Sequence, residues 1–322
     1  MKSKTQKPKM RRYTLMDFQA QFPDDATCLD WLFRYFYPGG TVFCEKCERE
    51  TKHHRVVSRP SYSCDYCGHH VHPTANTIFH KSPTPLTKWF YAIYLMSSTR
   101  CGISAKQIER ELGVTYKTAW RMFKQIRSML EEGSNPLGGP GGKGVEMDET
   151  YMGGRRKGGV GRPPAGDIKK TPVVGIVERK GRVRAMVADD VKGSTLLGMV
   201  KEHILPETTV FTDELNAYDG ITHMNRGYQH HRIKHSEKVY VVYEGSTAIH
   251  TNSVEGFWGL IKSGITGVYH AVGRGYLQSY LNEYSFRYNR RFDAQPMFKS
   301  FLNQIEKRNA IIRQEPVEVM PF

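Results

Sequence analysis

The sequence predicts a mixed α/β domain that follows a small metal-stapled module and an all-helical domain. Three observations support this: two CxxC pairs early in the chain, apolar residues at helical spacing from 86 to 130, and short β-like runs followed by helical patterns after residue 145. A chain of 322 residues is long enough for two or three such domains. We therefore expect separate segments with separate tasks.

The chain is strongly basic. Forty-seven Lys and Arg against 32 Asp and Glu give a formal net charge of +15, which attracts polyanions. Charge alone does not distinguish a DNA-binding protein from an RNA-associated one or from a generally basic surface. The basic start of the chain lacks an apolar signal core, and no stretch has the roughly 20 apolar residues that span a bilayer. We expect a cytoplasmic, nucleoid-associated protein.

Composition marks the domain boundaries. PGG at 38–40 ends a first helical segment, and EEGSNPLGGPGGKG at 131–144 has the Gly, Pro and Ser content of a flexible linker. The predicted parts are an N-terminal helical segment, a zinc ribbon, a helix-turn-helix domain, a linker, an α/β domain and a C-terminal tail, at residues 1–40, 41–80, 84–132, 133–144, 145–295 and 296–322.

Four cysteines have the spacing of a zinc ribbon. Two CxxC pairs are separated by sixteen residues, so two tight knuckles can direct four thiolates to one ion: Cys44, Cys47, Cys64 and Cys67. The alternative is two disulfides or four unrelated thiols, which a reduced compartment disfavours. Nearby histidines could replace a cysteine but are more typical of a polar face: His53, His54, His69, His70 and His72. Four protein ligands leave no open position, so we expect one structural Zn²⁺.

The segment ISAKQIERELGVTYKTAWRMFKQIR has the pattern of a helix-turn-helix. Ser104 can cap one short helix, Gly113 can end it, and Thr115 can cap the next. The second helix would turn its apolar residues inward: Ala119, Trp120, Phe123 and Ile126. Its start carries candidate contacts to bases and phosphates: Tyr116, Lys117, Thr118, Arg121 and Lys124. A plain helical bundle is the alternative.

Two aspartates occupy β-like contexts in the α/β domain. In VEMDETYMGG, alternation places Asp148 on one polar face with Glu146 and Thr150. In TTVFTDE, Asp213 ends an apolar run, from which its carboxylate can reach a site beside a neighbouring strand. An aspartate in that position is usually a turn former.

A third acidic residue lies in HTNSVEGFWGLIKSG. Glu255 and Lys262 are seven residues apart and fall on nearly one face of a helix. Three carboxylates of this kind can hold two metal ions that act on a phosphodiester. Because any three acids can be chosen from 32, the carboxylates alone leave a structural role open.

Taken together, these segments resemble the DDE insertion-sequence transposases with an N-terminal zinc ribbon, bacterial relatives of the Merlin transposon superfamily. The resemblance rests on the CxxC pairs, VEMDETYMGG, PVVGIVER, VFTDELNAY and above all HTNSVEGFWGLIKSGITGVYH. It implies an RNase H-like (retroviral-integrase-like) α/β catalytic domain in which two Mg²⁺ or Mn²⁺ ions are held by Asp148 on the first strand, Asp213 on the fourth and Glu255 on a later helix. It also implies strand transfer without a covalent protein–DNA intermediate, with Lys262 at the DNA phosphate or terminus.

Several neighbours of these residues leave alternatives open. Glu149 adjoins Asp148, and Asn252 lies one helical turn before Glu255, where it can cap the helix or assist as a neutral neighbour of the metal. His250 can contact a scissile phosphate or serve the structure. A glycine-spaced basic cluster close to Asp148 is expected to contact DNA phosphates: Arg155, Arg156, Lys157 and Arg162.

The expected function is that of a transposase. It would bind the terminal inverted repeats of its insertion sequence, cleave the 3′ ends and transfer them to target DNA. Pairing of two ends implies a homodimer or a larger assembly. Two rivals are a DNA-binding regulator with an inert transposase-derived domain, and a nuclease of the same fold that cuts without joining.

Overall fold

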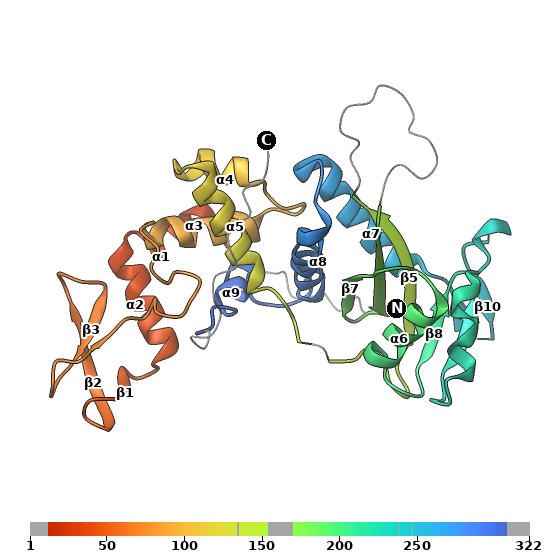
Figure 1. The fold of residues 1–322 in the computed structure, drawn as a ribbon, viewed down its shortest axis with the longest axis horizontal. Coiled ribbons are helices and arrows are strands. Elements are labelled where there is room, and N and C mark those ends of the chain that lie inside the picture. The colour runs from red at the N-terminus through yellow and green to blue at the C-terminus, as the bar shows by residue number, and fades with distance from the viewer. Residues whose placement is uncertain (1–11, 134, 154–169, 238, 246, 308–322) are drawn as a thin grey trace, which may run out of the picture. The chain divides into compact units, whose positions relative to one another are not determined.

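The structure is a computed structural model that describes residues 12–133, 135–153, 170–237, 239–245 and 247–307. Its described residues form two compact units (Figure 1). The first comprises residues 12–98, 105–129 and 295–307, and the second comprises 99–104 and 130–294. The predicted ribbon and helix-turn-helix therefore share one unit, and the predicted α/β domain makes up most of the other.

Aromatic helices form the centre of the first unit. Helices α1 (Leu15–Gln21) and α2 (Asp25–Phe36) begin at capping side chains that accept hydrogen bonds from backbone N–H groups. Both α2 and α9 (Met297–Leu302) pack against α3 (Leu86–Ser98). The rings of Phe22 and Phe90, for example, lie 4.8 Å apart. The predicted C-terminal tail thus contributes a packed helix, because Phe298 and Phe301 are buried.

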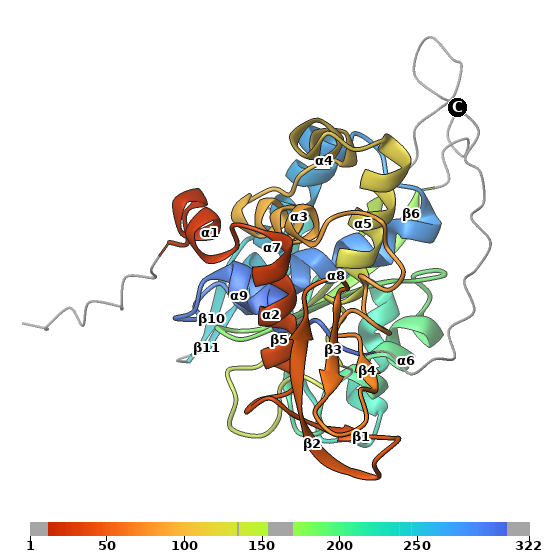
Figure 2. The ribbon, with the colours of Figure 1, turned by 90° about the vertical axis from the view of Figure 1, so that its left-hand side faces the viewer.

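A four-stranded antiparallel sheet follows α2. Its strands are β1 (Thr41–Cys44), β2 (Arg49–Val56), β3 (Ser61–Cys64) and β4 (His70–Val71), in sequence order (Figure 2). The apolar cluster beneath it is small, and the rings of Phe33 and Tyr62 stack there at 3.7 Å. So little buried apolar surface cannot stabilise a free-standing module, which agrees with the predicted metal staple.

Helices α4 (Ala105–Leu112) and α5 (Tyr116–Ser128) form the predicted helical pair. Gly113 between them has φ +57°, a conformation that glycine adopts readily, and the Thr115 side chain caps α5 by accepting from Thr118 N–H. The predicted inward residues Ala119, Phe123 and Ile126 are buried, whereas Trp120 is half-buried.

The second unit contains a five-stranded sheet in the order β7-β6-β5-β8-β9. Strands β5 (Val145–Met152), β6 (Thr171–Glu178) and β7 (Val183–Val187) are antiparallel, while β8 (Thr209–Thr212) and β9 (Gln229–Arg232) continue the sheet in parallel with β5. A separate hairpin joins β10 (Val242–Glu244) to β11 (Thr247–Ile249).

Helices cover both faces of this sheet. On one face, apolar residues of α6 (Gly193–His203) and the 3₁₀ helix η1 (Asn216–His223) pack against Val145 and Met147 of β5. On the other, α7 (Asn252–Gly264) packs against β5 and β6. A short 3₁₀ turn η2 (His235–Glu237) precedes α7, the π-helical turn η3 (Ile265–Tyr269) extends it, and α8 (Arg274–Asn289) packs against β7.

Part of the predicted linker is packed into the second unit. Leu137 is buried, its N–H donates to the carbonyl of His203 at 2.8 Å, and it bridges to Ile204. Leu137 and its backbone hydrogen bonds therefore attach this Gly-rich stretch to the core of the second unit.

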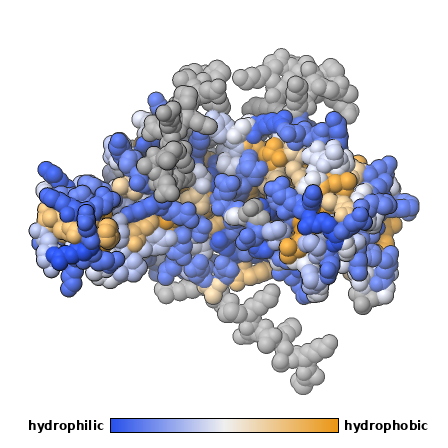
Figure 3. Space-filling model, turned by 60° about the horizontal axis from the view of Figure 1, so that its bottom comes forward, coloured by the Kyte–Doolittle hydropathy of each residue, from blue (hydrophilic) through white to orange (hydrophobic). Residues whose placement is uncertain are grey.

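The described residues include no helix that is both long and apolar enough to cross a membrane. Hydrophilic residues cover most of the face in Figure 3, interrupted by hydrophobic patches, in keeping with a mean hydropathy of −0.55.

Candidate active site

Three carboxylates meet at the edge of the central sheet. Oxygen atoms of Asp148, Glu149 and Asp213 lie within 4.8 Å of one another. The register explains this, because Glu146 of β5 pairs with Phe211 of the parallel strand β8, and each aspartate comes two residues later. Two of the three predicted metal ligands are thus brought together, and Glu149 joins them.

A tryptophan on the covering helix contacts the first aspartate. Trp258 Nε1 donates to Asp148 Oδ2 at 2.9 Å. Gly175 pairs with Asp148 across β5 and β6, and a Cβ at that glycine would lie 2.6 Å from Trp258 Cζ2. The missing side chain at Gly175 therefore lets the indole reach the carboxylate.

The other two carboxylates also have fixed partners. The Tyr218 hydroxyl donates to Glu149 Oε2 at 2.6 Å, and the backbone N–H of Leu215 donates to Asp213 Oδ1 at 3.0 Å. Successive side chains of a strand point to opposite faces of the sheet, so the strand pattern gives no reason to expect Glu149 beside Asp148 and Asp213. In the sequence it stands out only because it adjoins Asp148.

Burial and the nearness of other negative charges make it unfavourable for these carboxyl groups to lose their protons. Burial, followed by the charges of Glu149 and Asp213, raises the pKa of Asp148 to about 7. The pKa of Glu149 is also raised, chiefly by burial. A divalent cation would relieve this repulsion, and carboxylate oxygens are the ligands that Mg²⁺ prefers. The donor set fits the metal that the sequence predicts.

Glu255 is separate from that group of three. It lies on α7, three residues before Trp258, with its side chain 45% exposed. One of its oxygens, Oε1, accepts from Thr251 Oγ1 at 2.9 Å and lies 3.1 Å from Nε2 of His235. The predicted third ligand thus lies on the helix that covers the site, where its carboxylate contacts Thr251 and His235.

The remaining predicted residues of the site lie around this helix. Asn252 is the first residue of α7, and Lys262 in its last turn is exposed, with no ion pair to any described residue. His250 Nδ1 lies 3.1 Å from Oε1 of the buried Glu146. The predicted phosphate-contacting cluster lies outside the described residues: Arg155, Arg156, Lys157 and Arg162.

The four cysteines of the ribbon gather around one point. Their sulfur atoms lie within 4.8 Å of one another, at 3.5 Å for Cys44–Cys67 and 3.8 Å for Cys47–Cys64. A tetrahedral ion with Zn–S bonds of about 2.3 Å would hold its sulfurs roughly 3.8 Å apart, and a disulfide needs about 2.0 Å. The hydroxyl of Thr51 lies 3.2 Å from Cys64 Sγ and is the largest cause of a pKa lowered to about 5. The cluster is compatible with a zinc ribbon.

The predicted DNA-contacting side chains of α5 differ in their surroundings. Tyr116, Lys117 and Lys124 are exposed, and Thr118 is half-buried. Arg121 instead donates to Ser82 Oγ at 3.0 Å within the first unit. That arginine contributes to the fold.

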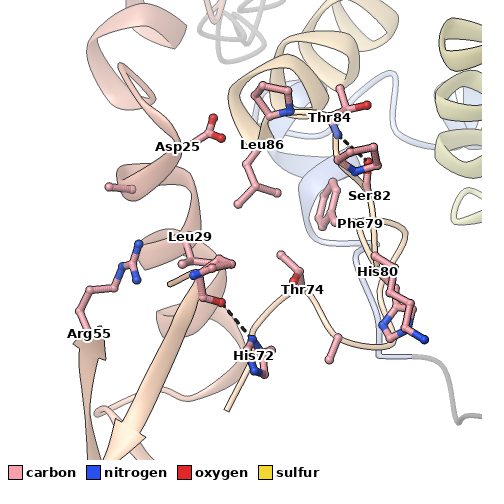
Figure 4. Close-up of a pocket in the computed structure, with 16 residues that line it drawn as sticks. Asp25, Leu29, Arg55, His72, Thr74, Phe79, His80, Ser82, Thr84 and Leu86 are labelled. Atoms are coloured by element: carbon pink, nitrogen blue, oxygen red, sulfur yellow. Dashed lines mark hydrogen bonds between the residues drawn. The ribbon is translucent and has the colours of Figure 1, made fainter. Parts of the chain in front are cut away.

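The first unit also contains a cavity of about 600 Å³ between α2 and the segment 72–86 (Figure 4). Leu29, Phe79 and Leu86 line it together with polar side chains that include Arg55 and His80. Among the described residues, no predicted carboxylate ligand, zinc-binding cysteine or DNA-contacting side chain lines it, whereas His72 does.

Comparison with known proteins finds similarity to transposases. The ISXO2-like transposase domain family matches residues 137–289. A protein of the transposable element ISH50 from Halobacterium salinarum is 26% identical over 263 residues, covering 76% of this chain and 85% of its own length. A transposase-like protein of Haemophilus influenzae is 26% identical over 110 residues, or 34% of this chain and 83% of its own length. These similarities support an insertion-sequence transposase of the DDE type, in which residues 137–289 match the ISXO2-like transposase domain.

Proposed function

We propose that this protein binds the terminal inverted repeats of its insertion sequence, cleaves their 3′ ends and joins them to target DNA in metal-dependent reactions. The observation that carries the proposal is that Asp148 on β5 meets Asp213, the residue directly after the parallel strand β8, inside a transposase family domain. Metal-dependent phosphodiester chemistry needs such a pair of carboxylates on a rigid support.

Two Mg²⁺ or Mn²⁺ ions are the proposed cofactors of this site. Asp148 and Asp213 would hold them together with Glu255, and Glu149 would be an adjacent ligand or neighbour. When bound, such a pair of ions activates the attacking hydroxyl and stabilises the leaving oxygen. The positions of Asp148 on the first strand of the sheet, Asp213 after its fourth and Glu255 on a later helix support an RNase H-like fold.

The protein's own groups would hold and orient the reacting phosphate. Trp258 fixes the Asp148 carboxylate through its indole N–H. Lys262 on the same helix is exposed and free to contact a DNA phosphate or terminus. Water and the 3′-hydroxyl would be the successive nucleophiles, so no covalent link between protein and DNA is required.

The first unit would recognise the element end. Its four-cysteine ribbon would bind one structural Zn²⁺, and α5 would enter the major groove with its exposed first turn. The net charge of +15 supports binding to double-stranded DNA and to the nucleoid. Pairing of two ends would require a homodimer or a larger assembly.

A joining assay tests the proposal. Purified protein, Mg²⁺, a labelled element-end duplex and a target plasmid would be compared for wild type, Asp148→Asn, Asp213→Asn and Glu255→Gln, with the exposed Glu202→Gln as the matched control. We expect joined products with the wild type and with Glu202→Gln, and none with the three other variants. Cleavage without joining would identify a nuclease, and tight DNA binding without metal-dependent chemistry would identify a regulator.

A further inference from the structure

A buried ion pair lies directly behind the carboxylate cluster. Glu146 on β5 has no exposed surface, and Arg179, just after β6, keeps only 12% of its side chain exposed. Arg179 Nε donates to Glu146 Oε1 at 2.9 Å. Burying two charges is costly unless their hydrogen bonds are satisfied, so the remaining partners of both groups are informative.

The arginine links two further segments of the unit. Its Nη1 donates to the carbonyl of Ala248 at 2.6 Å, and its Nη2 donates to the carbonyl of His250 at 2.8 Å, both in the segment that leads into α7. Its guanidinium also lies over the ring of Phe211, 3.5 Å from the centroid. Phe211 is on β8, two residues before Asp213.

The glutamate caps the helix from outside. Glu146 Oε2 accepts from the backbone N–H groups of Ser253 and Val254 at 2.7 and 3.2 Å, and Ser253 Oγ donates to Oε1 at 3.0 Å. The first N–H groups of a helix have no partner within it, and a carboxylate is favourable at that end. Thr251, which precedes α7, makes no capping bond with its side chain.

The pair therefore touches all three segments that carry a predicted metal ligand, and in each segment it includes or contacts the residue two positions before that ligand. Glu146 precedes Asp148, Phe211 precedes Asp213, and Ser253 precedes Glu255. Glu146 is not one of the three carboxylates whose oxygen atoms lie within 4.8 Å of one another. The ion pair therefore lies beside the candidate metal ligands and is not itself one of them. We propose that Glu146 and Arg179 are positioning residues that fix the start of α7 against β5 and β8, so that Glu255 can complete the metal site. This inference rests on the proposed function through Glu255.

A double-mutant cycle separates positioning from general stabilisation. Mn²⁺ binding to the full-length, zinc-loaded protein without DNA would be measured for wild type, Glu255→Gln, Glu146→Gln and the double variant. We expect Glu255→Gln to weaken Mn²⁺ binding roughly tenfold in wild type, and less than about twofold once Glu146 is replaced. The same loss in both backgrounds overturns the inference.

A second buried pair in the same unit supplies the control. Glu283 and Arg287 of α8 form an ion pair at 2.6 Å, with side chains only 1% and 9% exposed. Glu283→Gln should lower stability, as Glu146→Gln should, because each leaves a buried arginine without its carboxylate. In the Glu283→Gln background, however, Glu255→Gln must keep its full effect on Mn²⁺ affinity. Loss of that effect would overturn the inference, since any destabilised variant would then behave alike.

A milder variant covers the case in which Glu146→Gln does not fold. Ser253→Ala removes one hydroxyl donor to Glu146 and keeps the backbone N–H, and it should reduce the effect of Glu255→Gln on Mn²⁺ affinity by an intermediate factor. An unchanged effect in Ser253→Ala argues against positioning. Because binding is measured without DNA, coupled Mn²⁺ binding in a protein that joins no DNA would support the inference and reject only the proposed function. Equal Mn²⁺ affinity of wild type and Glu255→Gln would reject the inference itself.

Discussion

Trp258 donates its indole N–H to Asp148, and this bond joins the helix that covers the sheet to the strand that carries the first carboxylate. Glu255 lies one turn earlier on the same helix. The hydrogen bond favours the ionised form of Asp148, whereas burial and the neighbouring charges oppose it. The balance between these effects sets the pH at which the site can bind a cation.

Trp258→Phe should move the pH dependence of the reaction upward. Without the indole donor the pKa of Asp148 rises further above its present value of about 7, so a higher pH is needed to ionise the carboxylate. The measurement is the pH at half-maximal Mg²⁺-dependent cleavage, with Trp31→Phe in the first unit as the control. An unchanged midpoint would show that the bond does not control this ionisation.

Asp148→Asn should stabilise the metal-free protein at neutral pH. In wild type the folded state keeps the Asp148 proton up to about pH 7, while the unfolded chain loses it near pH 4, so stability falls as pH rises through that interval. The asparagine variant lacks this loss, and its advantage should grow to at most about 4 kcal/mol by pH 8. Urea unfolding of both proteins at pH 5 and pH 8, without added Mg²⁺, checks this. An advantage that is the same at both pH values would contradict it.

Gly175→Ala should destabilise the second unit. Its new methyl group would lie 2.6 Å from Trp258 Cζ2 and 3.2 Å from Val254 Cγ2, so the indole must move away from Asp148. We expect a cost of about 1–3 kcal/mol in the free energy of unfolding, together with reduced activity. Gly198→Ala is the control, because its methyl group would meet nothing within 4 Å on an exposed turn of α6 and should stabilise by about 0.5–1 kcal/mol. Equal effects of the two substitutions would rule out the indole contact as the cause.

Cys64→Ser should remove zinc and unfold the ribbon. The apolar cluster under the ribbon is too small to keep β1–β4 folded without the ion. Metal analysis should find one zinc per wild-type chain and none in the variant, and limited proteolysis should cut the variant between residues 41 and 80. Cys101→Ser, at an exposed cysteine outside the cluster, should keep both the zinc and the resistance. Full zinc content in Cys64→Ser would refute the four-thiolate site.

Lys117→Ala should weaken binding to element-end DNA in a salt-dependent way. Lys117 is exposed in the first turn of α5. Affinity for DNA falls as the salt concentration rises, and each lost phosphate contact makes the plot of log affinity against log salt less steep by roughly one. Lys143→Ala removes the same charge from an exposed loop of the second unit and should leave the slope unchanged. Equal slopes for wild type and Lys117→Ala would remove that lysine from the DNA contacts.

Short-range patterns predicted the parts of the fold that depend on neighbouring residues. The CxxC spacing predicted four converging sulfurs, and Gly113 and Thr115 predicted the end of one helix and the start of the next. The strand contexts of Asp148 and Asp213 predicted that both could reach a shared site, and they do.

Features that depend on distant partners were not predictable in this way. Alternation placed Glu146 on a polar face, yet it is fully buried, because an arginine 33 residues later and the N–H groups of a helix more than 100 residues later satisfy it. Glu149 turns toward Asp213 while Tyr218, 69 residues away, donates to it. Periodicity reports which face a residue prefers and gives no information about such partners.

The way the chain is divided between the two units limits how the protein can be recombined with others. Six residues between α3 and α4, 99–104, belong to the second unit, where Tyr284 donates to the carbonyl of Cys101 and Arg287 donates to that of Thr99. Residues 295–307 return to the first. A single cut at the Gly-rich stretch would therefore leave both halves incomplete. If α5 recognises the element end as proposed, recognition specificity can be exchanged between relatives by substitutions on the surface of α5, whereas a swap at the Gly-rich stretch would divide both units.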